Sequence, residues 1–182
     1  MTKDNSIDIK YFIVTGLAVF LTWLIHEFSH WMTGTILGNE MVMTLNQSFP
    51  ISGEYKESWH YQLTSAVGPI ITIIEAIVIY LIMRHNRRAI LYSTLFACFM
   101  CRFGATLLSF RNPNDEARIS QYLGIGTFTL PVIVTLFLLI LLIATTLKYK
   151  FSFRYVFLNF VLVTFFISCI VAADKYLHWQ LI

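Results

Sequence analysis

The sequence predicts an all-α membrane protein built as a bundle of about five transmembrane helices. Of its 182 residues, 57% are hydrophobic and only 13% are charged, whereas soluble domains carry about 25% charged residues. So small a charged share cannot cover a globular surface in water. In addition, several apolar stretches exceed the roughly 18 residues that are needed to span the hydrocarbon core of a bilayer.

Five apolar stretches are the predicted spans, and each is close to the expected length of about 20 residues. They cover residues 11–37, 62–83, 89–110, 127–147 and 155–174. No internal repeat, low-complexity tract or flexible linker separates them. We therefore expect one integral membrane domain over residues 1–182, in contact with the lipid bilayer and without a nucleic-acid partner.

Two connections between the spans are longer than the others, residues 38–61 and 111–126. The first contains the β-favouring run MVMTL and then several Pro and Gly turn signals, so it is either a short β-hairpin at the membrane surface or an irregular loop. The second contains NPNDEAR, residues 112–118, in which a turn precedes two acidic residues that begin a new helical segment.

The distribution of basic residues predicts a cytoplasmic N-terminus, because lysine and arginine near the ends of spans mark the cytoplasmic side. The N-terminal segment, the second-to-third connection and the fourth-to-fifth connection hold the larger set, which is Lys3, Lys10, Arg84, Arg87, Arg88, Lys148, Lys150 and Arg154. The opposite set is Lys56, Arg111, Arg118 and Lys175.

The first span contains the motif H-E-x-x-H, formed by His26, Glu27 and His30. On a helix, residues four apart lie one above the other, so both imidazoles project from one face. This is the geometry that two nitrogen ligands of one zinc ion require. Glu27 adjoins the first ligand, where a carboxylate can take a proton from a zinc-bound water and later deliver it to a leaving amine.

The membrane context strengthens the metal hypothesis for this motif. The alternative is that both histidines are satisfied by hydrogen bonds within the bundle and that the glutamate is incidental. However, a charged group at the centre of a membrane helix costs about 2.5–3.5 kcal/mol, and such residues are functional by default. Because three ionisable residues within five positions need a compensating partner, we expect one Zn²⁺ ion as the cofactor.

A catalytic zinc ion needs a third protein ligand and an open position for water. Asp115 is the first choice, Glu116 the second and His60 the third, because residues 112–118 lie on the same predicted side as the histidine end of the first span. The alternative for both acids is that they stabilise a helix N-terminus, where negative charge is favourable. The weaker candidates are Glu75, His85 and His178.

The run HEFSHWMTGTILGN, followed from residue 63 by LTSAVGPIIT, resembles the site-2 protease family of intramembrane zinc metalloproteases. That family combines an H-E-x-x-H helix, a surface β-hairpin, a Gly-Pro pair that opens the next helix, and a later ligand aspartate. The resemblance covers residues 20–85, and more weakly 111–125. It implies a zinc metalloendopeptidase with Gly68, Pro69 and Thr72 as substrate-binding candidates.

The chain also departs from the family pattern. Thr72 replaces an asparagine that binds substrate in the family, and Asp115 lies in N-D-E-A instead of L-D-G. An additional span, 89–110, precedes that aspartate. The family's zinc lies toward the cytoplasm, whereas the basic residues place this site nearer the outer face. Independently of the family, Gly68 and Pro69 are also explained as a simple helix start.

Two further ionisable residues, Glu75 and Arg102, fall within predicted spans. Counted at about 1.5 Å per residue from the presumed outer ends, they lie roughly 18 Å and 12 Å deep, which an arginine side chain can bridge. We therefore expect the two to lie together. They form either a structural ion pair or a site in which Arg102 polarises a substrate carbonyl or a developing oxyanion.

The sequence thus favours an intramembrane zinc metallopeptidase that cleaves a membrane-embedded or membrane-adjacent peptide. The substrate has to unwind locally, and it can do so by adding as a strand to the 38–61 hairpin. An adaptor protein is a candidate partner for substrate choice. The alternative is a non-proteolytic metal-binding membrane protein, which would be a sensor, a transporter or a structural zinc site. A homologue that holds substrates without cutting them is a third possibility.

Overall fold

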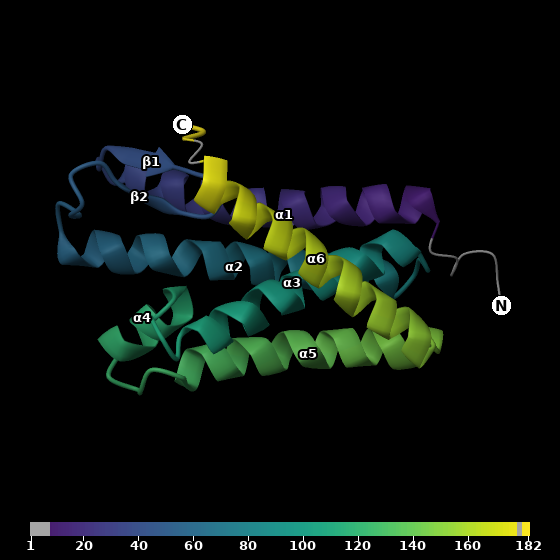
Figure 1. Ribbon diagram of the computed structural model, residues 1–182. Coiled ribbons are helices and arrows are strands. Elements are labelled where there is room, and N and C mark those ends of the chain that lie inside the picture. Colours follow the sequence, from purple (N-terminus) through teal and green to yellow (C-terminus); the bar gives the residue numbers. More distant parts are fainter. Residues whose placement is uncertain (1–7, 178–179) are drawn as a thin grey trace.

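The computed structural model describes residues 8–177 and 180–182 and confirms the predicted fold class. In the described residues, six helices and one small sheet follow one another along the chain (Figure 1). Five of the helices are long and apolar enough to cross a membrane. The elements are α1 (Ile9–Ile36), β1 (Met41–Met43), β2 (Ser48–Pro50), α2 (Ser58–Met83), α3 (Ala89–Leu108), α4 (Asp115–Tyr122), α5 (Thr129–Tyr149) and α6 (Phe153–Leu177).

The predicted spans and the observed long helices agree closely. The largest shift is at the start of α2, which begins at Ser58 instead of residue 62. Its first turn contains His60 and Gln62, so the helix starts before the apolar pattern does. The helical segment expected after the turn at 112–114 is also confirmed, since α4 begins at Asp115.

Helix α3 is the centre of the bundle. It packs against α1, α2, α5 and α6, and α6 crosses diagonally over the bundle in Figure 1. Its inner residues are among the most buried in the described chain and include Tyr92, Leu95, Phe96, Ala97 and Cys98. Residues on α3 that face the site are therefore held by neighbours on several sides.

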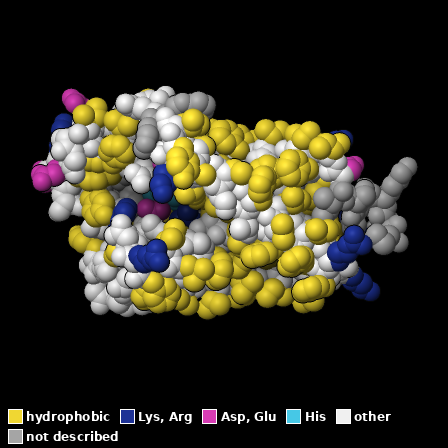
Figure 2. All heavy atoms as spheres, in the orientation of Figure 1, with side chains coloured by type: hydrophobic (Ala, Val, Ile, Leu, Met, Phe, Trp, Pro, Cys, Tyr) yellow, Lys and Arg dark blue, Asp and Glu magenta, His cyan; other side chains and the backbone are white. Residues whose placement is uncertain are grey.

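The outer surface of the long helices is apolar. Figure 2 shows hydrophobic side chains over the middle of one face, with charged side chains gathered toward the two ends. Large exposed residues come from each long helix, although those of α3 lie only in its last turn, and they include Leu17, Phe20, Ile74, Val78, Leu107, Leu136, Ile140, Phe157 and Phe165. In water such a surface would be unfavourable, whereas in a bilayer it contacts lipid. These features are those of a multi-pass membrane protein.

The segment after α1 forms the β-hairpin, which was the first of its two expected conformations. Strands β1 and β2 are antiparallel, with Met41 opposite Pro50 and Met43 opposite Ser48. The hairpin lies on α1, where Trp31 donates from Nε1 to the carbonyl of Met41 at 3.2 Å. A Cβ atom on Gly34 would lie 2.6 Å from the sulfur of Met41, so glycine permits this close approach.

A buried polar cluster ties α1, α3 and α6 together at the end of the bundle opposite the hairpin. The Asn159 Oδ1 atom accepts from the hydroxyl of Tyr11 at 2.6 Å and from that of Ser93 at 2.8 Å. The Asn159 amide donates to the carbonyl of Tyr155 at 2.9 Å. Because all four groups are buried, each depends on the others for its hydrogen bonds.

We expect Asn159→Leu to lower the free energy of unfolding by about 1–2 kcal/mol, because it removes the acceptor that two buried hydroxyls share. Equilibrium unfolding in a mild detergent titrated with SDS measures this. The matched control is Phe160→Leu, at the neighbouring position, where the side chain is 41% exposed. If Asn159→Leu and Phe160→Leu unfold at the same SDS fraction, the cluster does not stabilise the bundle.

Candidate metal centre

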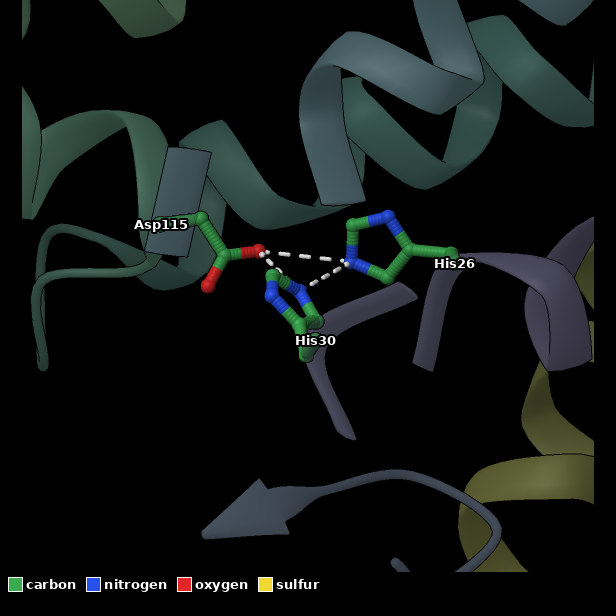
Figure 3. Close-up of side chains that lie close together, drawn as sticks. All are labelled: His26, His30 and Asp115. Atoms are coloured by element: carbon green, nitrogen blue, oxygen red, sulfur yellow. Dashed lines mark hydrogen bonds and ion pairs between the residues drawn. The ribbon is translucent and has the colours of Figure 1, made fainter. Parts of the chain in front are cut away.

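The three residues favoured as ligands meet in one group. His26 and His30 come from α1 and Asp115 from the start of α4, and their ligand atoms all lie within 4.8 Å of one another. Figure 3 shows the two imidazoles and the carboxylate pointing toward a common point. The Nε2 atoms are 3.1 Å apart, and Asp115 Oδ2 lies 3.3 Å from that of His26 and 3.4 Å from that of His30.

The spacing of these atoms fits a tetrahedral zinc site. Zinc binds histidine nitrogen and carboxylate oxygen at about 2.0–2.1 Å, so ligand atoms of a regular tetrahedron lie about 3.3–3.4 Å apart. The observed triangle has edges of 3.1–3.4 Å. Two histidines and one carboxylate with the fourth corner open are also the ligand set of one class of catalytic zinc site.

The tautomer of each imidazole is fixed by α2. His30 Nδ1 lies 2.6 Å from the carbonyl oxygen of Thr64, which can only accept, so this nitrogen donates. His26 Nδ1 lies 3.2 Å from the hydroxyl of Thr72, and that hydroxyl donates to the carbonyl of Gly68 at 3.1 Å. When the two rings are neutral, their Nε2 lone pairs therefore point to the centre, as metal ligation requires.

Helix α2 touches the imidazoles at Gly68. A Cβ atom at this position would lie 2.3 Å from Nε2 of His30 and 2.5 Å from Cε1 of His26. Any side chain would displace both rings. The explanation of Gly68 and Pro69 as a helix start is wrong, because α2 begins at Ser58 and Pro69 lies inside it. The pair instead marks where the α2 backbone approaches the candidate ligands.

Thr72 lies behind His26 and is 1% exposed. Sequence reasoning offered it as a substrate-binding candidate, whereas in the structure its hydroxyl contacts the ligand ring. The role of the Thr64 carbonyl was missed altogether. A main-chain acceptor has no side-chain signal in a sequence, so only the packing of α2 on α1 reveals it.

Arg102 also faces the group, and the expectation that it pairs with Glu75 is wrong. Its Nη1 atom lies 3.2 Å from Glu116 Oε1 and 3.5 Å from Asp115 Oδ2, and its Nη2 atom lies 3.2 Å from Nε2 of His26. Glu75 instead accepts from the hydroxyl of Thr22 at 2.7 Å. The depth count along straight helices could not anticipate that α4 brings its two acids to Arg102.

The first-choice third ligand is the one that joins the group. Asp115 is mostly buried, and Arg118 approaches its other oxygen at 3.6 Å. Arg102 Nη1 lies 3.5 Å from Oδ2, so guanidinium groups face both carboxylate oxygens and favour the ionised form that a metal ligand needs.

The other candidate ligands lie elsewhere. Glu116 is engaged by Arg102. The His60 ring contacts the side chains of Asn39 and Trp59 instead of the group. His178 lies outside the described residues.

Glu27 lies beside the candidate ligands and is 7% exposed. It interacts electrostatically with His30, Asp115 and Arg102, and also with Asp174 in the last turns of α6. Asp174 was missed by sequence analysis, although an acidic residue at the end of an apolar span was a visible signal. Its electrostatic effect on Glu27 indicates that the end of α6 lies near this side of the site.

The site is reached from the surface at the hairpin end of the bundle. Figure 2 shows a hollow between the hairpin and α4, with acidic and basic side chains on its floor. A neighbouring pocket of about 460 Å³ lies between α2 and α4, and its lining is polar: Tyr61, Gln62, Asn112, Pro113, Arg118, Gln121 and Tyr122. Arg118 lines this pocket and also lies 3.6 Å from Asp115 Oδ1, so the pocket adjoins the candidate metal centre.

We expect Gly68→Ala to abolish metal binding, because the new methyl group overlaps both imidazoles. The matched control is Gly104→Ala in α3, where an added Cβ meets nothing within 4 Å. Alanine is the better helix former by about 1 kcal/mol, so neither substitution weakens its helix intrinsically. Metal content after purification in the presence of zinc measures the effect. Equal content in Gly68→Ala and Gly104→Ala would contradict this geometry.

No family model matches the chain, and comparison with curated proteins and with solved structures finds no match either. The chemistry of the site is therefore argued from its own residues.

Proposed function

We propose that the protein is an intramembrane zinc metallopeptidase that cleaves a membrane-embedded or membrane-adjacent peptide. The observation that carries this proposal is the triangle of His26 Nε2, His30 Nε2 and Asp115 Oδ2, with edges of 3.1–3.4 Å. When the histidines are neutral, all three atoms present lone pairs to one another, and a metal ion bound between them would stabilise this arrangement.

The charge around the triangle supports a bound cation. Three carboxylates and two guanidinium groups lie beside it, which leaves a formal charge of −1 when the histidines are neutral and the carboxylates are ionised. The carboxylates are Glu27, Asp115 and Glu116, and the guanidinium groups are Arg102 and Arg118. One zinc ion bound there would polarise a carbonyl and lower the pKa of its water to about 7.

Glu27 acts as the general base and then as the general acid. It adjoins His26 in the chain and faces the candidate ligands, so it can receive a proton from the attacking water. It then passes that proton to the leaving amine nitrogen. Its low exposure keeps competing bulk water away from the carboxylate.

Arg102 supplies a second positive charge to the reacting carbonyl. Glu116 anchors one side of the guanidinium, and the other side points at His26. A donor held in place before the reaction stabilises a developing oxyanion without reorganising. This role is separate from that of the metal.

The substrate has to present an extended backbone. Amides in a membrane helix are bonded within the helix, so a scissile bond becomes accessible only after local unwinding. The hairpin on α1 offers a strand edge to which the unwound segment can add. The described residues are nearly all membrane-spanning helices and short connections, so an adaptor protein is the proposed means of substrate choice.

The resemblance to the site-2 protease family supports the same reaction, and a hairpin after the first long helix agrees with the family pattern. The sidedness differs. The basic residues favour a cytoplasmic N-terminus, and the start of α1 lies at the end of the bundle away from the hairpin (Figure 1). The proposed topology therefore places the metal centre away from the cytoplasm.

One observation favours a non-proteolytic role instead. Arg102 Nη2 lies 3.2 Å from Nε2 of His26, so the guanidinium approaches a lone pair that a metal would need. In that case the group is a structural ion cluster or a weak metal sensor. Metal stoichiometry and turnover together separate this function from the peptidase.

We expect purified wild-type protein to hold about one zinc ion per chain and Asp115→Ala to hold almost none, because a catalytic site keeps only three protein ligands. Glu27→Gln should keep the zinc and lose cleavage of a transmembrane model peptide by at least about 100-fold, because it removes the general base. Metal analysis and a reconstituted cleavage assay measure the two effects.

The control for this experiment is His60→Ala, which removes a buried histidine outside the group and should leave the metal content unchanged. If the folded wild-type protein binds no zinc when zinc is supplied, the peptidase proposal is wrong. Full cleavage by Glu27→Gln would remove Glu27 from the mechanism.

We expect Arg102→Lys to keep the protein level and zinc content and to lower kcat by about 10²–10³-fold, as loss of one oxyanion donor does. A lysine cannot hold Glu116 and reach the reacting carbonyl at once, because it lacks the planar fork of arginine. The control is Arg111→Lys, at an exposed position. Unchanged turnover in Arg102→Lys would leave Arg102 a purely structural role.

A further inference from the structure

Residues 180–182 pair with the outer edge of β1. The amide of Leu181 donates to the carbonyl of Met43 at 2.8 Å, and the amide of Met43 donates to the carbonyl of Ile182 at 3.1 Å. Thr44 and Gln180 form an antiparallel bridge beside them. The C-terminal residues of the sequence therefore extend the hairpin as a short third strand, next to β1 in Figure 1.

Met43 carries the main-chain groups on the outer edge of β1 that an added strand can bind. The opposite edge of β1 is used by β2, through bonds such as Thr44 N–H to Gln47 O at 2.8 Å. On the outer edge, the carbonyl of Met41 already accepts from Trp31. The amide and carbonyl of Met43 are thus the pair of main-chain groups that an added strand can engage, and residues 181–182 engage both.

The paired segment also lies next to the candidate active site. Ser48 of β2 donates to the carbonyl of Glu27 at 2.9 Å, which fixes the hairpin against the motif helix. Helix α6, which ends at Leu177, packs against α1, and Asp174 near its end lies close enough to Glu27 to act on it electrostatically. The end of α6 and the paired residues 180–182 thus both lie beside the helix and hairpin that carry the motif.

We propose that residues 180–182 occupy the strand position that an extended substrate needs on β1, and so compete with substrate from within the chain. This inference rests on the proposed peptidase function. Two hydrogen bonds at Met43 hold the segment, while Leu181 is 41% exposed and Ile182 49% exposed. So little burial makes the pairing exchangeable, and the covalent connection gives it a high effective concentration.

The first experiment measures access to the edge without any cleavage. The probe is a synthetic peptide of residues 175–182 that carries Gln180→Cys as an activated thiopyridyl disulfide. The target is the chain with Thr44→Cys and with exposed Cys169 replaced by alanine. We expect this peptide to react at least about tenfold faster when residues 180–182 are deleted, because the intramolecular competitor is gone. Rates are normalised to a small thiol reagent.

The matched control places the target cysteine at Gln47, in the hairpin turn on the β2 side of Thr44. Its normalised rate should be the same with and without residues 180–182. An equal rate at Thr44→Cys in the full and shortened chains would overturn the proposal, because the edge would then be open at all times. A faster rate in the shortened chain supports occupation of the edge.

The second experiment links the edge to turnover. Bridge partners in an antiparallel pair have Cα atoms about 4.5–5.5 Å apart, within the range that a disulfide spans. Oxidised Thr44→Cys/Gln180→Cys in the full chain should cleave a transmembrane model peptide at least about tenfold more slowly than the same protein after reduction. Equal turnover in the oxidised and reduced forms would overturn the proposed competition and leave the proposed peptidase function unaffected. Absence of cleavage by zinc-loaded wild type would instead overturn the peptidase, and with it the competition for substrate.

Discussion

The candidate metal centre is built around three potential acceptor atoms that face one another among buried side chains. Each imidazole has its Nδ1 atom bonded to α2, through the carbonyl of Thr64 and the hydroxyl of Thr72. Neither ring can turn its Nε2 atom away without losing a buried hydrogen bond. The glycine at position 68 lets α2 approach closely enough to impose this. The protein therefore holds three groups in an arrangement that suits a bound cation.

The same constraint explains where α4 begins. Asp115, the first residue of α4, lies against the two histidines, and Glu116, one residue later, contacts Arg102 on α3. The two acids thus have different tasks, one at the centre and one holding a guanidinium beside it. Because the anchor is a buried ion pair, removing Glu116 would leave Arg102 free to compete for the central lone pairs. The Glu116–Arg102 pair thus holds the guanidinium at a fixed position beside the point where a metal ion would bind.

Local patterns in the sequence were sufficient to predict the long helices and to single out His26, Glu27 and His30. Hydropathy and four-residue spacing depend only on residues that are neighbours in the chain. Asp115 followed from the side of the membrane on which its loop lies. The pairing of Arg102 was missed because it depends on how α4 folds back, and no spacing encodes that. The sequence named Thr72 and Gly68 as substrate-binding candidates. It could not show their contacts with the imidazoles, because these come from the packing of α2 on α1, a tertiary feature.

A strand edge beside a membrane site creates a problem that the fold has to solve. Main-chain groups that stay unpaired next to the hydrocarbon of the membrane are costly. An uncovered strand edge can also pair with the strands of other chains. Yet a peptide that leaves its helix to reach the site must find replacement partners for its own amides. The amide and carbonyl of Met43 meet both needs if a short, weakly buried segment covers them until a peptide arrives. Residues 180–182 are short and weakly buried. They protect the edge of β1 while they are paired with it, and they give a peptide access to the edge when they detach.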